Sequence, residues 1–189
     1  HKYRPRYTTY MSRNQEPGNT SRPLGKGMIV AAWILLLVLL TLFFNDRLEQ
    51  QRNPNMQLTG SITEQGTPSV RLERNRYGHY VASGYINDRP VEFMLDTGAS
   101  DVSSPLSVAE EIGLQKGKPV TYQTANGTIR AWQTVADEIR LGGLRVGPVR
   151  ASINPHVTNS GILLGMSFLK HLDFSQQGNT LTLSYPQTR

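Results

Sequence analysis

Residues 91–100 read Val-Glu-Phe-Met-Leu-Asp-Thr-Gly-Ala-Ser, and this stretch decides which fold we expect. Its first five residues alternate as in a β-strand and pass directly into Asp96, Thr97 and Gly98. Glycine permits the backbone of a sharp turn, and a threonine hydroxyl can brace a neighbouring group through a hydrogen bond. The order therefore predicts a carboxylate presented at a strand end on a tight, hydrogen-bonded turn.

Short β segments separated by turn-forming residues continue from Val70 to the end of the chain. Turn signals stand at Asn87-Asp88-Arg89-Pro90, at Asn126-Gly127 and at Gly142-Gly143, and each predicts a hairpin. The strands that we expect cover residues 77–86, 91–95, 120–124, 128–136, 138–141, 144–153, 162–164 and 180–185.

Two short helices are expected between these strands. The first covers residues 104–112, with Ser104 as N-cap, Pro105 at the first helical position and Gly113 at its end. The second covers residues 166–172. Many short strands with glycine turns and one or two short helices indicate an all-β fold, a small closed barrel.

Two segments carry a resemblance to a known family. The turn Asp96-Thr97-Gly98-Ala99-Ser100 resembles the active-site turn of the aspartic proteases, and Ile162-Leu163-Leu164-Gly165 resembles the apolar strand that crosses behind that turn. The intervening helix and glycine-containing hairpin follow the order of single-domain, retropepsin-like members. The resemblance covers about residues 70–186. It is closest to bacterial enzymes tethered by an N-terminal membrane helix, and it implies a small closed retropepsin-like (acid protease) barrel.

The resemblance implies that Asp96 is catalytic, and the chemistry then requires a second carboxylate. One carboxylate acts as base on a water while its protonated partner donates to the carbonyl oxygen, and two carboxyl groups about 3 Å apart cannot both ionise. The chain has one Asp-Thr-Gly and no second Asp-Thr-Gly or Asp-Ser-Gly. We therefore expect Asp96 to face Asp96 of a second copy across a two-fold axis. The alternative is a turn-capping carboxylate in an ordinary β protein.

Neighbouring residues take further roles from the resemblance. Thr97 is expected to hydrogen-bond across the dimer axis or within its own turn, and Ala99 to line the cleft. Asp101 is expected as a solvent-facing charge, with an influence on the paired carboxylates or on substrate preference as the alternative. Tyr122 and Trp132 are expected in the core or at the base of a hairpin. The tip of that hairpin would be a flap that closes over a bound peptide, or else a plain exposed hairpin; its residues are Ala125, Asn126, Gly127 and Thr128.

Charge and composition restrict the kinds of partner. The formal net charge is +6, but residues 1–27 carry a net of +5 and residues 45–189 only +1. The folded part is thus nearly neutral, which argues against nucleic acid as a partner. The absence of cysteine excludes disulfides and thiolate metal sites. His79, His156 and His171 lack a metal-ligand spacing, so we expect neither a metal nor a cofactor.

Residues 28–44 contain no charge, proline or glycine. With residues 24–27 they can cross a hydrocarbon core of about 30 Å at about 1.5 Å per residue. The alternatives are a buried core helix, which would need a polar face, and a cleaved signal peptide, which would need small residues near its end. We expect an uncleaved single-pass anchor in a bacterial inner membrane. The basic tail would lie in the cytoplasm and the C-terminal domain in the periplasm.

These observations predict four parts: a basic disordered cytoplasmic tail at 1–27, a transmembrane helix at 28–44, a polar juxtamembrane linker at 45–69 and the protease domain at 70–189. The first functional interpretation is a membrane-anchored, homodimeric aspartic endopeptidase. Its partners would be a peptide or protein substrate, a second copy and the lipid bilayer. The alternative is a catalytically silent accessory or binding subunit of a larger membrane protein complex, because a single half-site leaves a lone copy inert.

Overall fold

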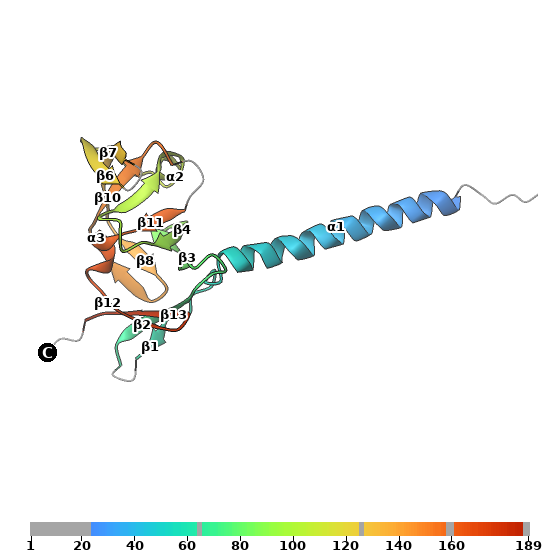
Figure 1. Ribbon diagram of the computed structural model, residues 1–189, viewed down its shortest axis with the longest axis horizontal. Coiled ribbons are helices and arrows are strands. Elements are labelled where there is room, and N and C mark those ends of the chain that lie inside the picture. The colour runs from blue at the N-terminus through green and yellow to red at the C-terminus, as the bar shows by residue number, and fades with distance from the viewer. Residues whose placement is uncertain (1–23, 64–65, 125–126, 158–160, 187–189) are drawn as a thin grey trace, which may run out of the picture. The chain divides into compact units, whose positions relative to one another are not determined.

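The computed structural model describes residues 24–63, 66–124, 127–157 and 161–186. The chain divides into two compact units, residues 1–43 and 44–189, which we describe separately. Figure 1 shows the single long helix and the strands of the second unit. The folded unit is mostly β-sheet with two short helices, as the sequence predicts.

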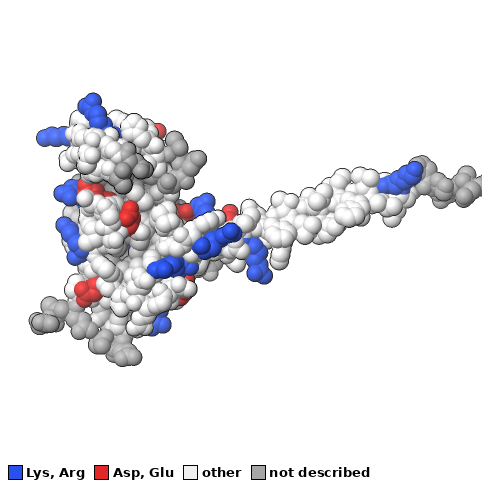
Figure 2. All heavy atoms as spheres, viewed as in Figure 1, with Lys and Arg blue, Asp and Glu red and all other residues white. Residues whose placement is uncertain are grey.

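Helix α1 (Leu24–Arg52) is longer at both ends than the expected span of 28–44. Every side chain from residue 28 to residue 44 is exposed. By length and composition α1 can cross a membrane, and a signal sequence near an N-terminus would pass the same test. Figure 2 shows the helix as uncharged along most of its length, whereas basic and acidic side chains intersperse over the visible face of the second unit.

The strands form two sheets. One has nine strands in the order β6-β7-β10-β5-β11-β4-β3-β8-β9, and the other has four in the order β1-β2-β13-β12. The strands are β1 (Ser61–Ile62), β2 (Pro68–Glu73), β3 (Val81–Ile86), β4 (Arg89–Leu95), β5 (Val102–Pro105), β6 (Pro119–Thr124), β7 (Gly127–Ala136), β8 (Ile139–Leu141), β9 (Leu144–Val146), β10 (Val149–Asn154), β11 (Ile162–Leu164), β12 (Asp173–Gln177) and β13 (Thr180–Ser184); the short helices are α2 (Leu106–Glu111) and α3 (Met166–Leu169).

The hairpin β3–β4 delivers the chain to the Asp-Thr-Gly turn. Asn87 and Asp88 form a two-residue turn in which both φ angles are positive, at 47° and 63°, and the strands pair from Ile86 and Arg89 onward. Two positive φ angles match the right-handed twist of the flanking strands. Because the turn is this tight, residues 89 and 90 belong to β4 rather than to the four-residue turn that we expected.

The short apolar strand β11 lies between β4 and β5 at the centre of the larger sheet. It runs parallel to β4, with Ile162 opposite Phe93 and Leu164 opposite Leu95. Ile162, Leu164 and Phe93 are buried, and full burial of such a side chain contributes roughly 1.5–3 kcal/mol. The prediction that residues 162–164 form a strand beside the Asp96 strand end is confirmed.

Several local expectations are wrong. The expected strand 144–153 is two strands, β9 and β10, because Pro148 has no N–H for the ladder. Ser104 is not an N-cap: it is buried in β5, its hydroxyl donates to the Pro105 carbonyl at 3.1 Å, and Pro105 stands at the cap position. Gly113 does end α2, at a φ of +77°. The sequence did not predict β12, because its five residues are all exposed and show no alternation.

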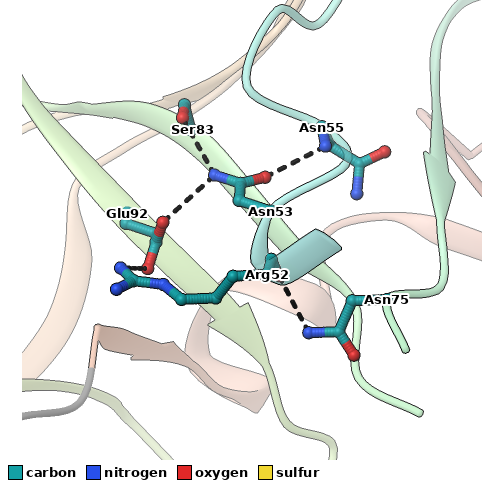
Figure 3. A network of polar contacts seen from close by, with 6 residues as sticks. All are labelled: Arg52, Asn53, Asn55, Asn75, Ser83 and Glu92. Atoms are coloured by element: carbon teal, nitrogen blue, oxygen red, sulfur yellow. Dashed lines mark hydrogen bonds and ion pairs between the residues drawn. The ribbon is translucent and has the colours of Figure 1, made fainter. Parts of the chain in front are cut away.

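The first part of the expected linker at 45–69 belongs to the folded unit instead. Helix α1 continues to Arg52, whose terminal nitrogen pairs with Glu92 Oε1 at 2.6 Å. The Asn53 amide, only 3% exposed, donates to Ser83 Oγ at 3.1 Å and to Glu92 Oε2 at 3.2 Å (Figure 3). Its oxygen accepts the Asn55 backbone N–H at 3.0 Å. These contacts attach the end of α1 to the hairpin that carries Asp96.

Asn55 completes the attachment with an amide that is 5% exposed. Its nitrogen donates to the carbonyls of Glu73 and Val81 at 2.9 and 2.7 Å, and its oxygen accepts the Glu73 N–H at 2.7 Å. One side chain thus bridges the end of β2 to the start of β3, where no strand pairing joins them. Since unpaired buried backbone groups cost about 1–3 kcal/mol each, this bridge is part of the domain's stability.

Candidate active site

The Asp96 turn is held by backbone groups of its own residues and by one carbonyl of β11. The Asp96 N–H donates to the Leu164 carbonyl at 3.3 Å, which ties the strand end to β11. The Gly98 N–H donates to Asp96 Oδ1 at 2.8 Å, and the Ala99 N–H donates to the Asp96 carbonyl at 3.2 Å. Asp96 and Ala99 are half-buried, whereas Thr97, Gly98 and Ser100 are exposed. The carboxylate is therefore oriented by its own turn and borders solvent.

The residues that follow β11 hydrogen-bond to the same turn. The Met166 N–H donates to the Ala99 carbonyl at 2.8 Å, and the Ser167 N–H donates to the Ser100 carbonyl at 2.9 Å. A Cβ at Gly165 would meet the carbonyl oxygens of Ala99, at 2.6 Å, and of Asp101. Glycine is required there because the two backbones approach too closely for any side chain.

Asp101 is not the solvent-facing charge that we expected, because it is only 6% exposed. Its Oδ1 accepts Arg150 Nε at 2.7 Å and its Oδ2 accepts the Tyr122 hydroxyl at 2.7 Å. Ser167 continues the cluster: its hydroxyl donates to the Arg150 carbonyl at 2.7 Å and accepts the Val102 N–H at 2.9 Å. The cluster joins the Asp96 turn to β6, β10 and α3.

Electrostatics raise the pKa values of Tyr122 and Arg150 in this cluster. Burial, reinforced by the neighbouring Asp101 carboxylate, raises the pKa of Tyr122 to about 12. The hydrogen bond to Asp101 likewise raises the pKa of the Arg150 guanidinium above its ordinary value. Tyr122 therefore remains a neutral donor and Arg150 a cation throughout the physiological range.

The β6–β7 hairpin has the predicted place in the chain. It lies at one edge of the larger sheet, and Tyr122 of β6 brings it onto Asp101. The Thr124 hydroxyl donates to the Gly127 carbonyl at 2.7 Å, and Gly127 has a φ of +108°. Thr128 Oγ1 donates to Gln123 Oε1 at 2.8 Å. Ala125 and Asn126 of the expected flap tip lie outside the described residues.

Two cavities flank the turn. One, of about 280 Å³, is lined by residues 97–100 together with Arg150, Met166, Ser167 and Lys170. The other, of about 470 Å³, is lined by Asp96, Thr97 and a mostly apolar group: Tyr80, Leu95, Leu169, Phe174, Gln176, Leu181 and Leu183. A larger cavity of about 580 Å³ borders the β3–β4 hairpin and includes no residue of the turn. The Asp96 carboxylate therefore borders the cavity of about 470 Å³ and not the one of about 580 Å³.

Two comparisons with known proteins agree with this geometry. A family model described as "gag-polyprotein putative aspartyl protease" matches residues 82–171, from β3 to the residues after α3. A crystal structure of a retropepsin-like aspartic protease from Rickettsia conorii is 26% identical and has a TM-score of 0.54. The match covers 68% of this chain and 96% of that one. The chain is therefore similar, in fold and in this motif-bearing region, to the retropepsin-like aspartic proteases.

Two curated relatives of this retropepsin-like chain are uncharacterized proteins. One, from the 5′ region of cobV in a Sinorhizobium species, is 28% identical over 158 residues, which is 78% of this chain and 68% of the relative. The other, from Rickettsia prowazekii (strain Madrid E), is 31% identical over 123 residues, which is 61% of this chain and 51% of the relative. The chain thus spans about half the length of the Rickettsia relative.

In this retropepsin-like domain the structure brings together the two predicted motifs, 96–100 and 162–165. Sequence reasoning missed the pairing of Asp101 with Arg150, because 49 residues separate them and no local pattern links them. It also left open whether Tyr122 lies in the core or at the hairpin base, and the contact with Asp101 places it on the turn. The described residues contain no group of three or more histidine or acidic side chains that could hold a metal.

Proposed function

We propose that this chain is a membrane-anchored aspartic endopeptidase whose catalytic pair, Asp96 with Asp96 of a second copy, forms across a homodimer. The observation that carries the proposal is the Asp96 carboxylate, oriented at a strand end by the Gly98 N–H at 2.8 Å. The exposed Thr97 and Gly98 stand beside it. One chain supplies one such half-site, and a two-fold axis through the turn completes it.

The paired carboxylates would hydrolyse a peptide bond by general acid–base catalysis. The ionised Asp96 takes a proton from a water, whose oxygen bonds to the carbonyl carbon of the substrate. The protonated Asp96 of the second copy donates to the carbonyl oxygen. In the second step one hydroxyl of the tetrahedral intermediate returns its proton to Asp96 of the second copy, the carbon–nitrogen bond breaks, and the leaving nitrogen receives the proton held by the first Asp96. The exposed Thr97 of each copy would hydrogen-bond across the axis and hold the two turns together.

The β6–β7 hairpin would act as the flap. Tyr122 fixes its base to Asp101, while Gly127 and Thr128 lie near its tip. An extended substrate segment between flap and turn can pair with the hairpin's backbone as an added strand. Ala125 and Asn126 complete the proposed tip, and closure over the substrate would exclude water from the reaction.

Helix α1 would be the membrane anchor. Its apolar stretch is long enough to span a bilayer, and the basic residues 1–27 favour the cytoplasmic side for the N terminus. The protease domain would then act in the periplasm, at the outer face of a bacterial inner membrane. Peptide segments near that surface would be its substrates, and lipid would surround the helix.

A catalytically silent accessory subunit of a membrane protein complex is the second candidate. It is favoured by the single half-site, since a copy that never dimerises has no catalytic pair. The two candidates differ in one measurable property, which is whether two copies of the turn act together.

Subunit mixing tests this property. Wild-type chain in detergent should cleave an extended-peptide library, be blocked by pepstatin-like mimics of the tetrahedral intermediate, and lose specific activity on dilution. Adding an equal amount of the Asp96→Asn variant should inactivate mixed pairs, because random exchange leaves about half of the wild-type chains with an inactive partner. Asp173→Asn, which changes an exposed carboxylate of β12, is the matched control and should leave activity unchanged. A wild-type chain that stays monomeric and inert would support the accessory role instead.

A further inference from the structure

The 280 Å³ cavity beside the active-site turn has an unusual lining for a space next to a catalytic carboxylate. Residues 97–100 form part of its lining, and two cationic residues, Arg150 and Lys170, contribute to it together with Met166 and Ser167. Asp96 lines the other cavity and not this one. The two hollows that meet at Thr97 therefore differ in character: one is mostly apolar and contains the catalytic carboxylate, and the other is cationic.

Arg150 is held in a defined orientation. Its side chain is 65% exposed, but the Nε end donates to Asp101, whose side chain is 5% exposed. The second oxygen of Asp101 is bonded to Tyr122, and the Arg150 backbone carbonyl accepts the Ser167 hydroxyl. Since the bond to Asp101 uses Nε, the two terminal nitrogens keep four N–H donors for another partner. A guanidinium that is fixed at one end loses less conformational entropy when its fork binds a carboxylate.

The charges around the cavity favour a carboxylate. The negative charge of Asp101 neutralises that of Arg150 as seen from a distance. The four terminal N–H donors of Arg150, however, are not used by Asp101 and remain available. Lys170 adds an uncompensated positive charge from the residue after α3, and it is exposed. The negative charge of the catalytic pair, on the other side of Thr97, disfavours a second carboxylate at the scissile bond itself. The favoured position is therefore displaced from that bond, along residues 98–100.

From this geometry we propose that the cavity is a subsite for an acidic side chain, aspartate or glutamate, of a peptide substrate, with Arg150 as the specificity-determining residue and Lys170 as a second cation. This inference rests on the proposed endopeptidase function, whose substrate class it names. Charge-assisted bonds from a guanidinium fork to a carboxylate give geometric specificity as well as affinity. A glutamine in the same place would keep an oxygen acceptor but lose the charge that attracts Arg150 and Lys170.

Binding to the full-length Asp96→Asn chain in detergent separates recognition from catalysis. The probes are fluorescent, extended neutral octapeptides in which one glutamate is moved along the sequence, each paired with its glutamine counterpart. At one position displaced from the centre, glutamate should bind about tenfold more tightly than glutamine, as a charge-assisted pair in a partly exposed site allows. Glutamate and glutamine peptides that bind equally at every position, or a series in which no peptide binds, would overturn the inference.

Three variants in the Asp96→Asn background assign the preference. Arg150→Gln should remove it while the glutamine peptides bind as before; a merely structural role would weaken both members of each pair. Lys170→Gln changes an exposed side chain and tests the site without disturbing Asp101, and it should lower the preference about threefold. Arg71→Gln, in β2 of the other sheet, is the control and should change nothing. A preference that survives both cavity variants contradicts the proposal.

Cleavage of the same peptides by the wild-type chain is measured separately. If the Asp96→Asn chain binds with the glutamate preference and the wild-type chain cleaves none of the peptides, the endopeptidase function fails and the subsite stands. If the wild-type chain cleaves glutamate and glutamine peptides with equal kcat/KM, the function stands and the subsite fails.

Discussion

Asp96 and Asp101 lie five positions apart on one turn, yet the structure gives the two carboxylates opposite settings. Asp96 is half-buried and accepts one bond from a backbone N–H of its own turn. Asp101 is buried and accepts bonds from two side chains that are 21 and 49 residues away. One carboxylate thus borders solvent with a single backbone donor, while both oxygens of the other are used to join the turn to β6 and β10.

The largest expected effect separates the two carboxylates by activity. Asp96→Asn should lower kcat by a factor of at least about 100, because general acid–base groups of this kind contribute factors of that order or more. The thermal midpoint should change little, since the amide keeps the side-chain volume and the Gly98 bond. Peptide-cleavage rates and thermal unfolding of the same preparation check this. A variant that keeps more than half of the activity would assign Asp96 to turn capping.

Asn55, like Asp101, is a buried polar side chain whose hydrogen bonds hold the scaffold. Asn55→Ala should lower the free energy of unfolding by about 2–4 kcal/mol, because two carbonyls and one N–H of β2 and β3 lose a buried partner.

A fragment that begins at residue 60 should be destabilised at least as much as this variant, whereas one that begins at residue 44 keeps the attachment. Denaturant unfolding measures the free energy of unfolding of both fragments and of the variant, and Asn45→Ala, which changes an exposed side chain, is the control for the variant. Equal stabilities of the two fragments would mean that residues 44–59 do not stabilise the domain.

Asp101→Asn tests whether the buried carboxylate of the pair contributes to stability. It should lower the free energy of unfolding by about 1–3 kcal/mol, because the buried amide cannot accept from both Arg150 and Tyr122 as a carboxylate does. Arg150 remains solvated, so the loss is smaller than for a fully buried ion pair. Denaturant unfolding measures the effect, and Asp88→Asn, which alters an exposed carboxylate of the β3–β4 turn, is the control. An unchanged midpoint would mean that Asp101 does not hold the scaffold.

The smallest expected effect is the titration of Tyr122. Because its folded pKa, about 12, lies above its ordinary value of 10.0, its contribution to stability is complete below about pH 10 and is lost as the pH rises through about 12. The tyrosinate absorbance of the wild-type chain minus that of Tyr122→Phe should show this late titration. A difference curve centred near pH 10 would mean that Tyr122 is not engaged with Asp101.

The sequence by itself determined the features that depend on neighbours in the chain. The Asp96 turn, a hairpin turn beginning at Asn87, the end of α2 at Gly113 and the apolar stretch of α1 each follow from residue types at adjacent or alternating positions. Such patterns act through local backbone geometry and hydrophobic periodicity, so they can be read before any packing is known. The family resemblance supplied the pairing of residues 96–100 with 162–165, which lie far apart in the chain.

Only the tertiary structure decided the features in which distant polar groups satisfy one another. The bonds from Arg150 and Tyr122 to Asp101, and those of Asn55 to Glu73 and Val81, link residues 18 to 49 positions apart. An aspartate or asparagine in a turn-rich segment is ordinarily exposed, and nothing local distinguishes the buried ones. They are buried because the fold places a matching donor or acceptor at each of their polar atoms, and that match exists only after the strands have packed.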